Sequence, residues 1–167
     1  FMTELGADEA LDKLAVLLEG KGWIDERAML EAEVLSINEE PRVFHALNDV
    51  VVARGSIARM IHVEASIDGE LLTIYRADGV ILATATGSTG YSLAAGGPIL
   101  HPKAQEFLLL PILPHLSLAY TLVLAATAMV NLRITTFHQA TLSIDGHINL
   151  PISSGATVTI KRSSNIG

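Results

Sequence analysis

The spacing of apolar residues changes early in this 167-residue chain. Between Gly6 and Gly20, leucines and alanines recur every three or four residues, which predicts a helix. Asp8 is suited to cap its N-terminus, and Gly20 and Gly22 are suited to end it. From Met29 onward apolar and polar residues alternate, which is the pattern of strands that bury one face.

The remainder of the chain is divided into short apolar segments by turn residues. Asp68-Gly69 between two such segments predicts a hairpin. Many short strands with one inserted helix indicate a mainly β domain, an antiparallel β-sandwich-like arrangement. We predict strands at Leu30–Ile37, Val43–Ala53, Ile57–Ile67, Leu71–Tyr75, Val80–Leu82, Phe107–Ile112, Leu122–Ala126, Asn131–Ile134, Ala140–Ile144 and Ala156–Ile160.

Composition argues against several classes of protein. A net charge of −7 argues against nucleic-acid binding, and the lack of cysteine excludes disulfides and thiolate metal sites. The apolar stretch Phe107–Val130 approaches the length of a membrane span, but Pro111 and Pro114 interrupt it. Two buried strands joined by a proline-rich turn fit better, so we expect no membrane span. No signal peptide is visible, and we expect a cytoplasmic protein.

A glycine-rich loop between a strand and a short helix is the first candidate for chemistry. The strand Val80–Leu82 is followed by small hydroxyl and glycine residues at 84–90, then by helix formers at Tyr91–Ala95 and by a Gly96-Gly97-Pro98 stop. A helix N-terminus of this kind offers unpaired N–H groups to a phosphate or ribose. The same residues also occur in turns for backbone reasons alone.

Further polar residues stand out against apolar surroundings. Asn48-Asp49 interrupts a predicted strand, where polar groups are costly unless they are bonded to a ligand or to the backbone. Arg76 and Asp78 are two residues apart before the loop, so we expect both on one side of the same strand. The pair could bind a phosphate and an amide of a dinucleotide, or it could be a solvated ion pair. Asp145-Gly146 is a turn dipeptide by itself. The histidines show no spacing typical of metal ligands.

The sequence D-G-V-I-L-A-T-A-T-G-S-T-G-Y-S-L-A-A-G-G-P-I-L, which begins at Asp78, strongly resembles the signature of NAD kinases. Asn48-Asp49 resembles that family's upstream Asn-Glu/Asp motif, Pro114-His115 its Pro-His element, and Asp145-Gly146 its late Asp-Gly pair. The order and spacing of the four motifs match. The family's Gly-Gly-Asp-Gly motif belongs to an N-terminal α/β domain, and no such tetrapeptide occurs in this chain.

The resemblance implies a set of NAD contacts and also shows departures from the family pattern. Gly90 stands where relatives carry alanine, Tyr120-Thr121 where they carry Arg-Pro, and His147 where glutamine often follows the Asp-Gly pair. Asp49 is one methylene shorter than the glutamate of many relatives. The NAD-binding residues implied by the resemblance are Asn48, Asp49, Arg59, Arg76, Asp78, Thr89, Gly90, Tyr91, Ser92, Leu93, Ala94 and His147, with Asp145 as a further candidate.

By the same resemblance, the activity is transfer of the γ-phosphoryl group of ATP, or of a phosphoryl group of polyphosphate, to the adenosine ribose 2′-hydroxyl of NAD, which makes NADP. Mg²⁺ or another divalent metal would accompany ATP. The catalytic aspartate would lie in the N-terminal domain, so we expect no catalytic residue and no useful activity in this chain alone. Residues 1–28 would be a linker helix, and residues 29–167 an all-β domain for NAD binding and for homo-oligomer (dimer or tetramer) formation.

Two other functions remain open from the residues. Diacylglycerol and sphingosine kinases share a similar two-domain plan, although the Asn48-Asp49 and T-G-S-T-G-Y-S elements fit a dinucleotide better than a lipid. A non-enzymatic β-sandwich module for oligomerisation would use the glycine loop only as a turn. Such a module should show no thermal shift with NAD.

Overall fold

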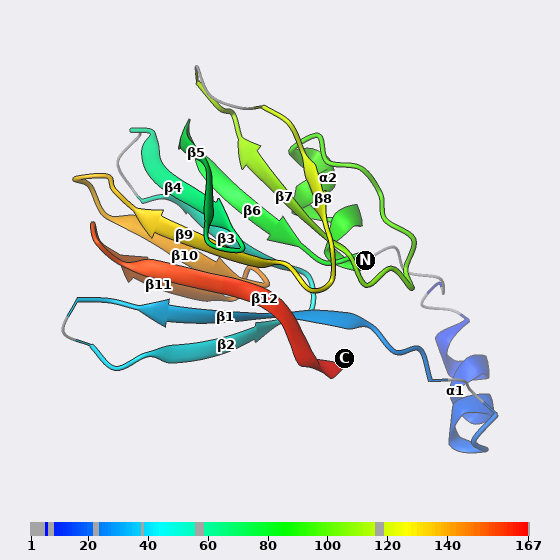
Figure 1. Ribbon diagram of the computed structural model, residues 1–167. Helices are drawn as coiled ribbons and strands as arrows, with labels where there is room; N and C mark the ends of the chain where they lie inside the picture. Colours follow the sequence, from blue (N-terminus) through cyan, green and yellow to red (C-terminus); the bar gives the residue numbers. More distant parts are fainter. Residues whose placement is uncertain are drawn as a thin grey trace.

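The computed structural model describes residues 6, 9–21, 24–37, 39–55, 59–115 and 119–166. Helix α1 (Ala10–Leu18) lies apart from the strands (Figure 1), and its Leu11 and Leu18 are largely exposed. The helix is shorter than predicted. Glu9 occupies the N-cap position, while the predicted residues Asp8 and Gly22 lie outside the described part of the chain.

Two six-stranded antiparallel sheets form the rest of the fold, as the sequence predicts (Figure 1). The first sheet has the order β2-β1-β12-β9-β4-β5, and the second has the order β11-β10-β3-β6-β7-β8. The strands are β1 (Ala28–Leu35), β2 (Arg42–Ala46), β3 (Asp49–Arg54), β4 (Ile61–Ile67), β5 (Glu70–Ala77), β6 (Gly79–Ala83), β7 (Phe107–Ile112), β8 (Leu122–Leu124), β9 (Met129–Ile134), β10 (Ala140–Ile144), β11 (Ile148–Ile152) and β12 (Thr157–Ile166).

The main core lies between the two sheets. Along each strand, every second side chain points inward, so alternate residues such as Leu30, Ala32 and Val34 of β1 are buried. The partner sheet contributes a matching set, for example Val50 and Val52 of β3. This packing explains the two-residue period that is read from the sequence.

The chain passes between the sheets at polar corners, and here two predictions are wrong. Val43–Ala53 is not one strand, because Leu47 and Asn48 form a corner between β2 in the first sheet and β3 in the second. Arg76 and Asp78 are likewise not on one strand. Strand β5 ends at Ala77, and Asp78 is the corner between β5 in the first sheet and β6 in the second.

The second sheet is also covered on part of its outer face. Ile81 of β6 and Leu108 of β7 are fully buried there, beneath the segment that contains the 3₁₀ turn η1 (Gly87–Thr89) and helix α2 (Tyr91–Ala94). Figure 1 shows α2 on this side of the sheet. Because β6 is buried on both faces, its sequence is a continuous apolar run rather than an alternating one.

One strand was not predicted, and one apolar stretch was predicted only in part, because β7 is buried as expected but β8 is a short edge strand whose Val123 is exposed. Strand β11 contains Pro151, which lowers its resemblance to a strand, but β11 is an edge strand, where proline is tolerated. The stretch Phe107–Val130 contributes β7 and β8. Among the described residues, no helix is both long enough and apolar enough to cross a membrane.

Candidate functional site

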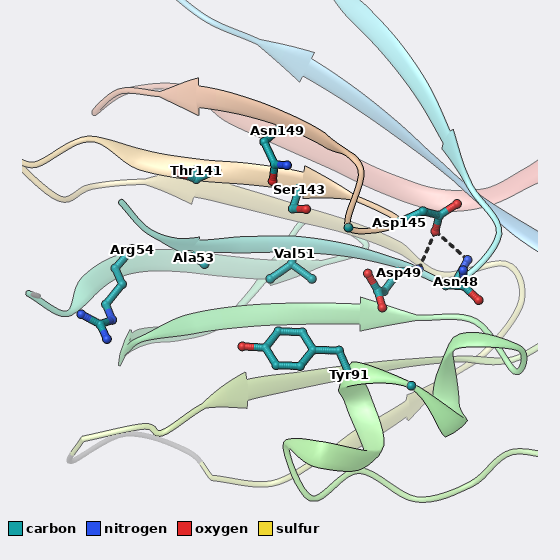
Figure 2. Close-up of a pocket in the computed structure, with 12 residues that line it drawn as sticks. Asn48, Asp49, Val51, Ala53, Arg54, Tyr91, Thr141, Ser143, Asp145 and Asn149 are labelled. Carbon is teal, nitrogen blue, oxygen red and sulfur yellow. Dashed lines mark hydrogen bonds between the residues drawn. The ribbon is translucent and has the colours of Figure 1, made fainter. Parts of the chain in front are cut away.

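A pocket of about 540 Å³ opens on the outer face of the second sheet, beside the edge of α2 (Figure 2). Its floor is β3 and β10, and its ends are the β10–β11 turn and the start of α2. It lies next to the part of the sheet that α2 covers. The lining residues are Asn48, Asp49, Val51, Ala53, Arg54, Gly90, Tyr91, Thr141, Ser143, Asp145, Gly146 and Asn149.

A second pocket of about 490 Å³ continues the first along β3. The two share Ala53, Arg54 and Tyr91, so they form one groove with Tyr91 at its middle. Asp78 lines the far end, where its Oδ2 lies 3.2 Å from Nε of Arg54. We call the two pockets together the β3 groove. Its length suits an elongated ligand with two ends.

The Asn48-Asp49 corner is held by a residue almost 100 positions away. The carboxylate of Asp145 accepts hydrogen bonds from the backbone N–H groups of Leu47 (2.8 Å), Asn48 (2.7 Å) and Asp49 (3.0 Å). In return, the N–H of Asp145 donates to the carbonyl of Asp49 at 2.9 Å. Figure 2 shows Asp145 beside this corner. The corner is therefore fixed through its backbone.

The glycine loop holds the same corner from the other side. The hydroxyl of Thr84 donates to the carbonyl of Leu47 at 2.6 Å and accepts from the N–H of Gly87 at 3.1 Å. The N–H of Thr84 donates to the carbonyl of Asn48 at 2.9 Å. A methyl group on Gly87 would overlap the carbonyl of Asn48, so the loop can approach this closely only with glycine there. Three separate motifs thus meet at one point.

Asp49 is the most unusual group in the groove. Asp49 is only 7% exposed, yet among the described residues its carboxylate has no hydrogen-bond partner. Burial, and then the nearby charge of Asp145, raise the pKa of Asp49 to about 6. In Figure 2 the carboxylate points into the groove toward Tyr91. A buried carboxylate in this state favours a ligand that brings hydrogen-bond donors.

Tyr91 supplies the main aromatic surface of the groove. It is the first residue of α2 and half exposed, and its ring lies along the groove in Figure 2. An exposed ring of this kind can stack on a flat ligand, while its hydroxyl remains free to bond at the rim. Gly90, directly before it, lines the same pocket.

The structure brings together only part of the residue set implied by the resemblance. Asn48, Asp49, Gly90, Tyr91 and Asp145 line the larger pocket, and Asp78 lines the adjoining one. The remaining members of the glycine segment do not line either pocket. They are Thr89, whose hydroxyl donates to the carbonyl of Thr86; Ser92, which is buried; and Leu93 and Ala94, which are exposed.

Two arginines and a histidine from the same set also lie outside the β3 groove. Arg59 lines a different pocket, where its Nη1 lies 3.1 Å from Nε2 of His138. Arg76 is on β5 of the first sheet, opposite His62. His147 is exposed in the β10–β11 turn, with Nδ1 3.4 Å from the carbonyl of Asp145.

Sequence reasoning missed four polar lining residues. Thr141 and Ser143 alternate with the buried Leu142 and Ile144 along β10, so both face outward into the pocket. That alternation was the available signal, because two small polar residues occupy one face of a strand that is apolar on the other. Arg54 and Asn149 carried no comparable signal.

The described residues contain no group of three histidine, cysteine or acidic side chains that could hold a metal ion. Asp49 and Asp145 are neighbours, but the carboxylate oxygens of Asp145 are occupied by backbone N–H groups.

Comparison with known proteins decides the family. The ATP-NAD kinase C-terminal domain matches residues 47–166. The chain belongs to this family. It is 53% identical over 165 residues to an NAD kinase of Dehalococcoides mccartyi, covering 98% of this chain and 58% of that protein. It is 40% identical over 166 residues to an NAD kinase of Chloroflexus aurantiacus, covering 99% of this chain and 60% of that protein.

Solved structures agree with this assignment. Yeast NADH kinase in complex with NADH matches with a TM-score of 0.86 and 31% identity, over 98% of this chain and 48% of that chain. An NAD kinase from Archaeoglobus fulgidus in complex with ATP matches with a TM-score of 0.79 and 25% identity, over 99% and 62%. The resemblance read from the sequence and the fold class are both confirmed. The chain spans somewhat more than half the length of the curated relatives it matches.

Proposed function

We propose that this chain forms the NAD-binding part of an NAD kinase, which transfers the γ-phosphoryl group of ATP to the adenosine ribose 2′-hydroxyl of NAD and so makes NADP. The family membership supports the activity. The observation that carries the assignment of the site is the carboxylate of the buried Asp49, which faces the β3 groove without a hydrogen-bond partner in the described part of the chain.

The groove offers what a dinucleotide requires. A ribose carries two neighbouring hydroxyl donors, and the two oxygens of one ionised carboxylate can accept both. The side-chain amide of Asn48, which also has no partner among the described residues, can accept from one hydroxyl and donate to the other. Tyr91 lies between the two pockets, where its ring can stack on a base. Asp78 at the far end can accept from an amide.

The chemical step depends mainly on position and charge neutralisation. In this proposal the chain's own residues bind the ribose, orient its 2′-hydroxyl and exclude water from the corner at Asn48. The base that removes the hydroxyl proton and the groups that hold the donor would come from the part of the relatives' length that this chain does not span. We therefore expect no turnover by the 167-residue chain above a control without enzyme.

The remaining partners belong to the same proposal. The donor is ATP or polyphosphate, with Mg²⁺ or another divalent metal carried by the donor, and the protein works in the cytoplasm as a homo-oligomer. Apolar residues make up 50% of the chain, and its strands give broad flat surfaces, which supports association of copies.

A thermal-shift titration with NAD, NADP and ATP tests the binding assignment. A ligand present at about 100 times its Kd stabilises the folded chain by about 2.7 kcal/mol, or about 5 °C or more in Tm. We expect NAD or NADP, but not ATP, to give this shift. Tyr91→Ala and Asp78→Ala should reduce it.

Tyr120→Ala and Asp68→Ala are matched controls, because both residues lie outside the groove and should leave the shift unchanged. If neither the 167-residue chain nor a longer chain with the rest of the relatives' length responds to NAD, the proposal is wrong. A purely structural β module is then the better assignment.

A further inference from the structure

The β10–β11 turn does more than reverse the chain. Asp145 has a φ of 51° and Gly146 a φ of 72°, so both adopt the left-handed conformation. In this conformation the Asp145 carboxylate reaches across to the corner before β3. Together, its carboxylate and its N–H make four hydrogen bonds to the backbone of residues 47–49. The turn and the corner are one rigid unit.

This arrangement leaves the functional side chains without direct support. Asn48 and Asp49 make no side-chain hydrogen bond among the described residues, so only their backbone fixes the direction in which they point. We propose that Asp145 is a positioning residue of the dinucleotide site: its carboxylate aims Asn48 and Asp49 into the groove through the backbone, and its charge acts on the carboxylate of Asp49. This inference rests on the proposed function.

The assignment changes the role that the resemblance suggested for Asp145. A carboxylate offers about four lone-pair sites, and here both oxygens already accept from the protein. Few sites are left for a ligand hydroxyl, whereas the oxygens of Asp49 are unused. Asp145 therefore acts on the ligand through Asp49 rather than by contact.

The charge of Asp145 is the second way in which it acts on Asp49, in addition to the hydrogen bonds to the backbone. After burial, it is the next cause that raises the pKa of Asp49 to about 6. The other titratable or charged groups that line the same pocket as Asp49 are Tyr91 from α2 and Arg54 from the far end of β3, while His147 of the β10–β11 turn is exposed outside it. Ionised Asp49 accepts from ribose hydroxyls and its protonated form accepts less well, so NAD affinity should rise with pH through about 6.

Asp145→Asn is the informative change. Asparagine tolerates the left-handed backbone, but it has no charge and a single acceptor oxygen, so it cannot satisfy all three N–H groups. The fold already contains a matched control. Asp68 has a φ of 52°, precedes Gly69, and its carboxylate accepts from the N–H of Met129 at 2.9 Å, far from the groove. Asp68→Asn makes the same chemical change at another turn.

The first readout is NAD binding by calorimetry between pH 5 and pH 8. We expect Asp145→Asn to weaken binding at pH 8 by about tenfold and to move the midpoint of the pH dependence below that of the unchanged chain. Asp68→Asn should leave both the affinity and the midpoint unchanged. A residue that only stabilised the fold would lower Tm without moving the midpoint.

The second readout needs no ligand. The carboxyl-carbon NMR signal of Asp49, followed against pH, should titrate near 6 in the unchanged chain and at lower pH in Asp145→Asn. Hydrogen exchange at the amides of 47–49 should become faster in the same variant and stay the same in Asp68→Asn.

These readouts separate the two proposals. If NAD does not bind but the Asp49 signal and the three amides respond as expected, the proposed function fails and the positioning role stands. If Asp145→Asn binds NAD as the unchanged chain does, with the same midpoint and the same amide protection, the positioning role is wrong. The role is also overturned if Asp68→Asn moves the midpoint equally.

Discussion

The outer faces of the two sheets differ in how their polar groups are satisfied. On the first sheet, neighbouring strands pair their own side chains. Nζ of Lys161 lies 3.1 Å from Oε1 of Glu31, and the hydroxyl of Thr159 donates to Oδ1 of Asn131 at 2.8 Å. On the second sheet, apolar residues such as Ile81 are buried beneath the glycine segment, and next to them lies the β3 groove.

The difference shows where a β-sandwich can place a binding site. Side chains that satisfy one another on an open face leave little for a ligand to bind. The glycine segment covers β6 and β7, but β3 and β10 remain open beside it. At that boundary Asp49 is buried and Asn48 is half-buried, and neither side chain makes a hydrogen bond among the described residues. We therefore place the proposed binding site at the edge of the covered region, and four changes test this contrast.

Gly87→Ala should have the largest effect on stability. The added methyl group would overlap the carbonyl of Asn48, so the loop and the corner must separate. We expect a loss of about 3 kcal/mol in the free energy of unfolding, measured by urea denaturation. Gly90→Ala is the control, because its methyl group would lie 3.4 Å from the nearest atom, the carbonyl oxygen of Gly87, which is an ordinary van der Waals contact. Equal losses in the two variants would contradict the close approach at Gly87.

Thr84→Val should cost about 2 kcal/mol, because it leaves the Leu47 carbonyl and the Gly87 N–H without their partner. Thr86→Val in the same loop is the matched control. The Thr86 hydroxyl is buried and has no hydrogen-bond partner among the residues that the structure describes, so its replacement should cost nothing or add stability. Urea denaturation of both variants measures the two losses. A larger loss of stability in Thr86→Val than in Thr84→Val would contradict the role of Thr84 in joining the glycine loop to the Asn48-Asp49 corner.

Asp49→Asn should weaken NAD binding by tenfold or more and yet stabilise the free protein at pH 8 by about 1 kcal/mol. The sign follows from the pKa, which is raised from 3.8 to about 6 in the folded state. The folded chain then holds this proton more tightly than the unfolded chain, so the cost of ionising Asp49 builds up between pH 3.8 and about 6, stays constant above that range and is absent below it. The stability gain should therefore vanish at pH 3.5, as denaturation at both pH values would show.

Lys161→Ala should have the smallest effect. Its ion pair with Glu31 is on an open face, where such pairs contribute about 0.5 kcal/mol or less and are screened by salt. We expect a change within that range and unchanged NAD affinity by calorimetry. A clear loss of NAD affinity would mean that the outer face of the first sheet takes part in binding.

Much of the fold was readable because one physical constraint repeats along the chain. Strands that bury one face alternate, and this located β1, β5, β9 and β10 closely, whereas β7 was marked by its continuous apolar run. The corners at Asn48 and Asp78 were not readable, because strand-like sequence continues on both sides of each and nothing local shows that the chain changes sheets. Strand β11 was hidden by Pro151, which is tolerated because β11 is an edge strand.

The site was readable in its motifs but not in its contacts. Residue type marked Asn48 and Asp49 as candidates, the resemblance added Tyr91, and all three line the groove. The hydrogen bonds from Asp145 to residues 47–49 span 96 to 98 positions, and no local pattern encodes them. Nor could spacing show that Arg76 lies on the first sheet, since that depends on where the chain crosses over.

Amide chemical shifts during an NAD titration of the ¹⁵N-labelled chain test the central claim most directly. The account predicts that the largest changes occur at residues 47–49, 90–91 and 143–146, around the β3 groove. Amides of Glu31, Asn131 and Lys161 on the outer face of the first sheet should not move. Changes concentrated on that face, with the groove unaffected at saturating NAD, would contradict the account.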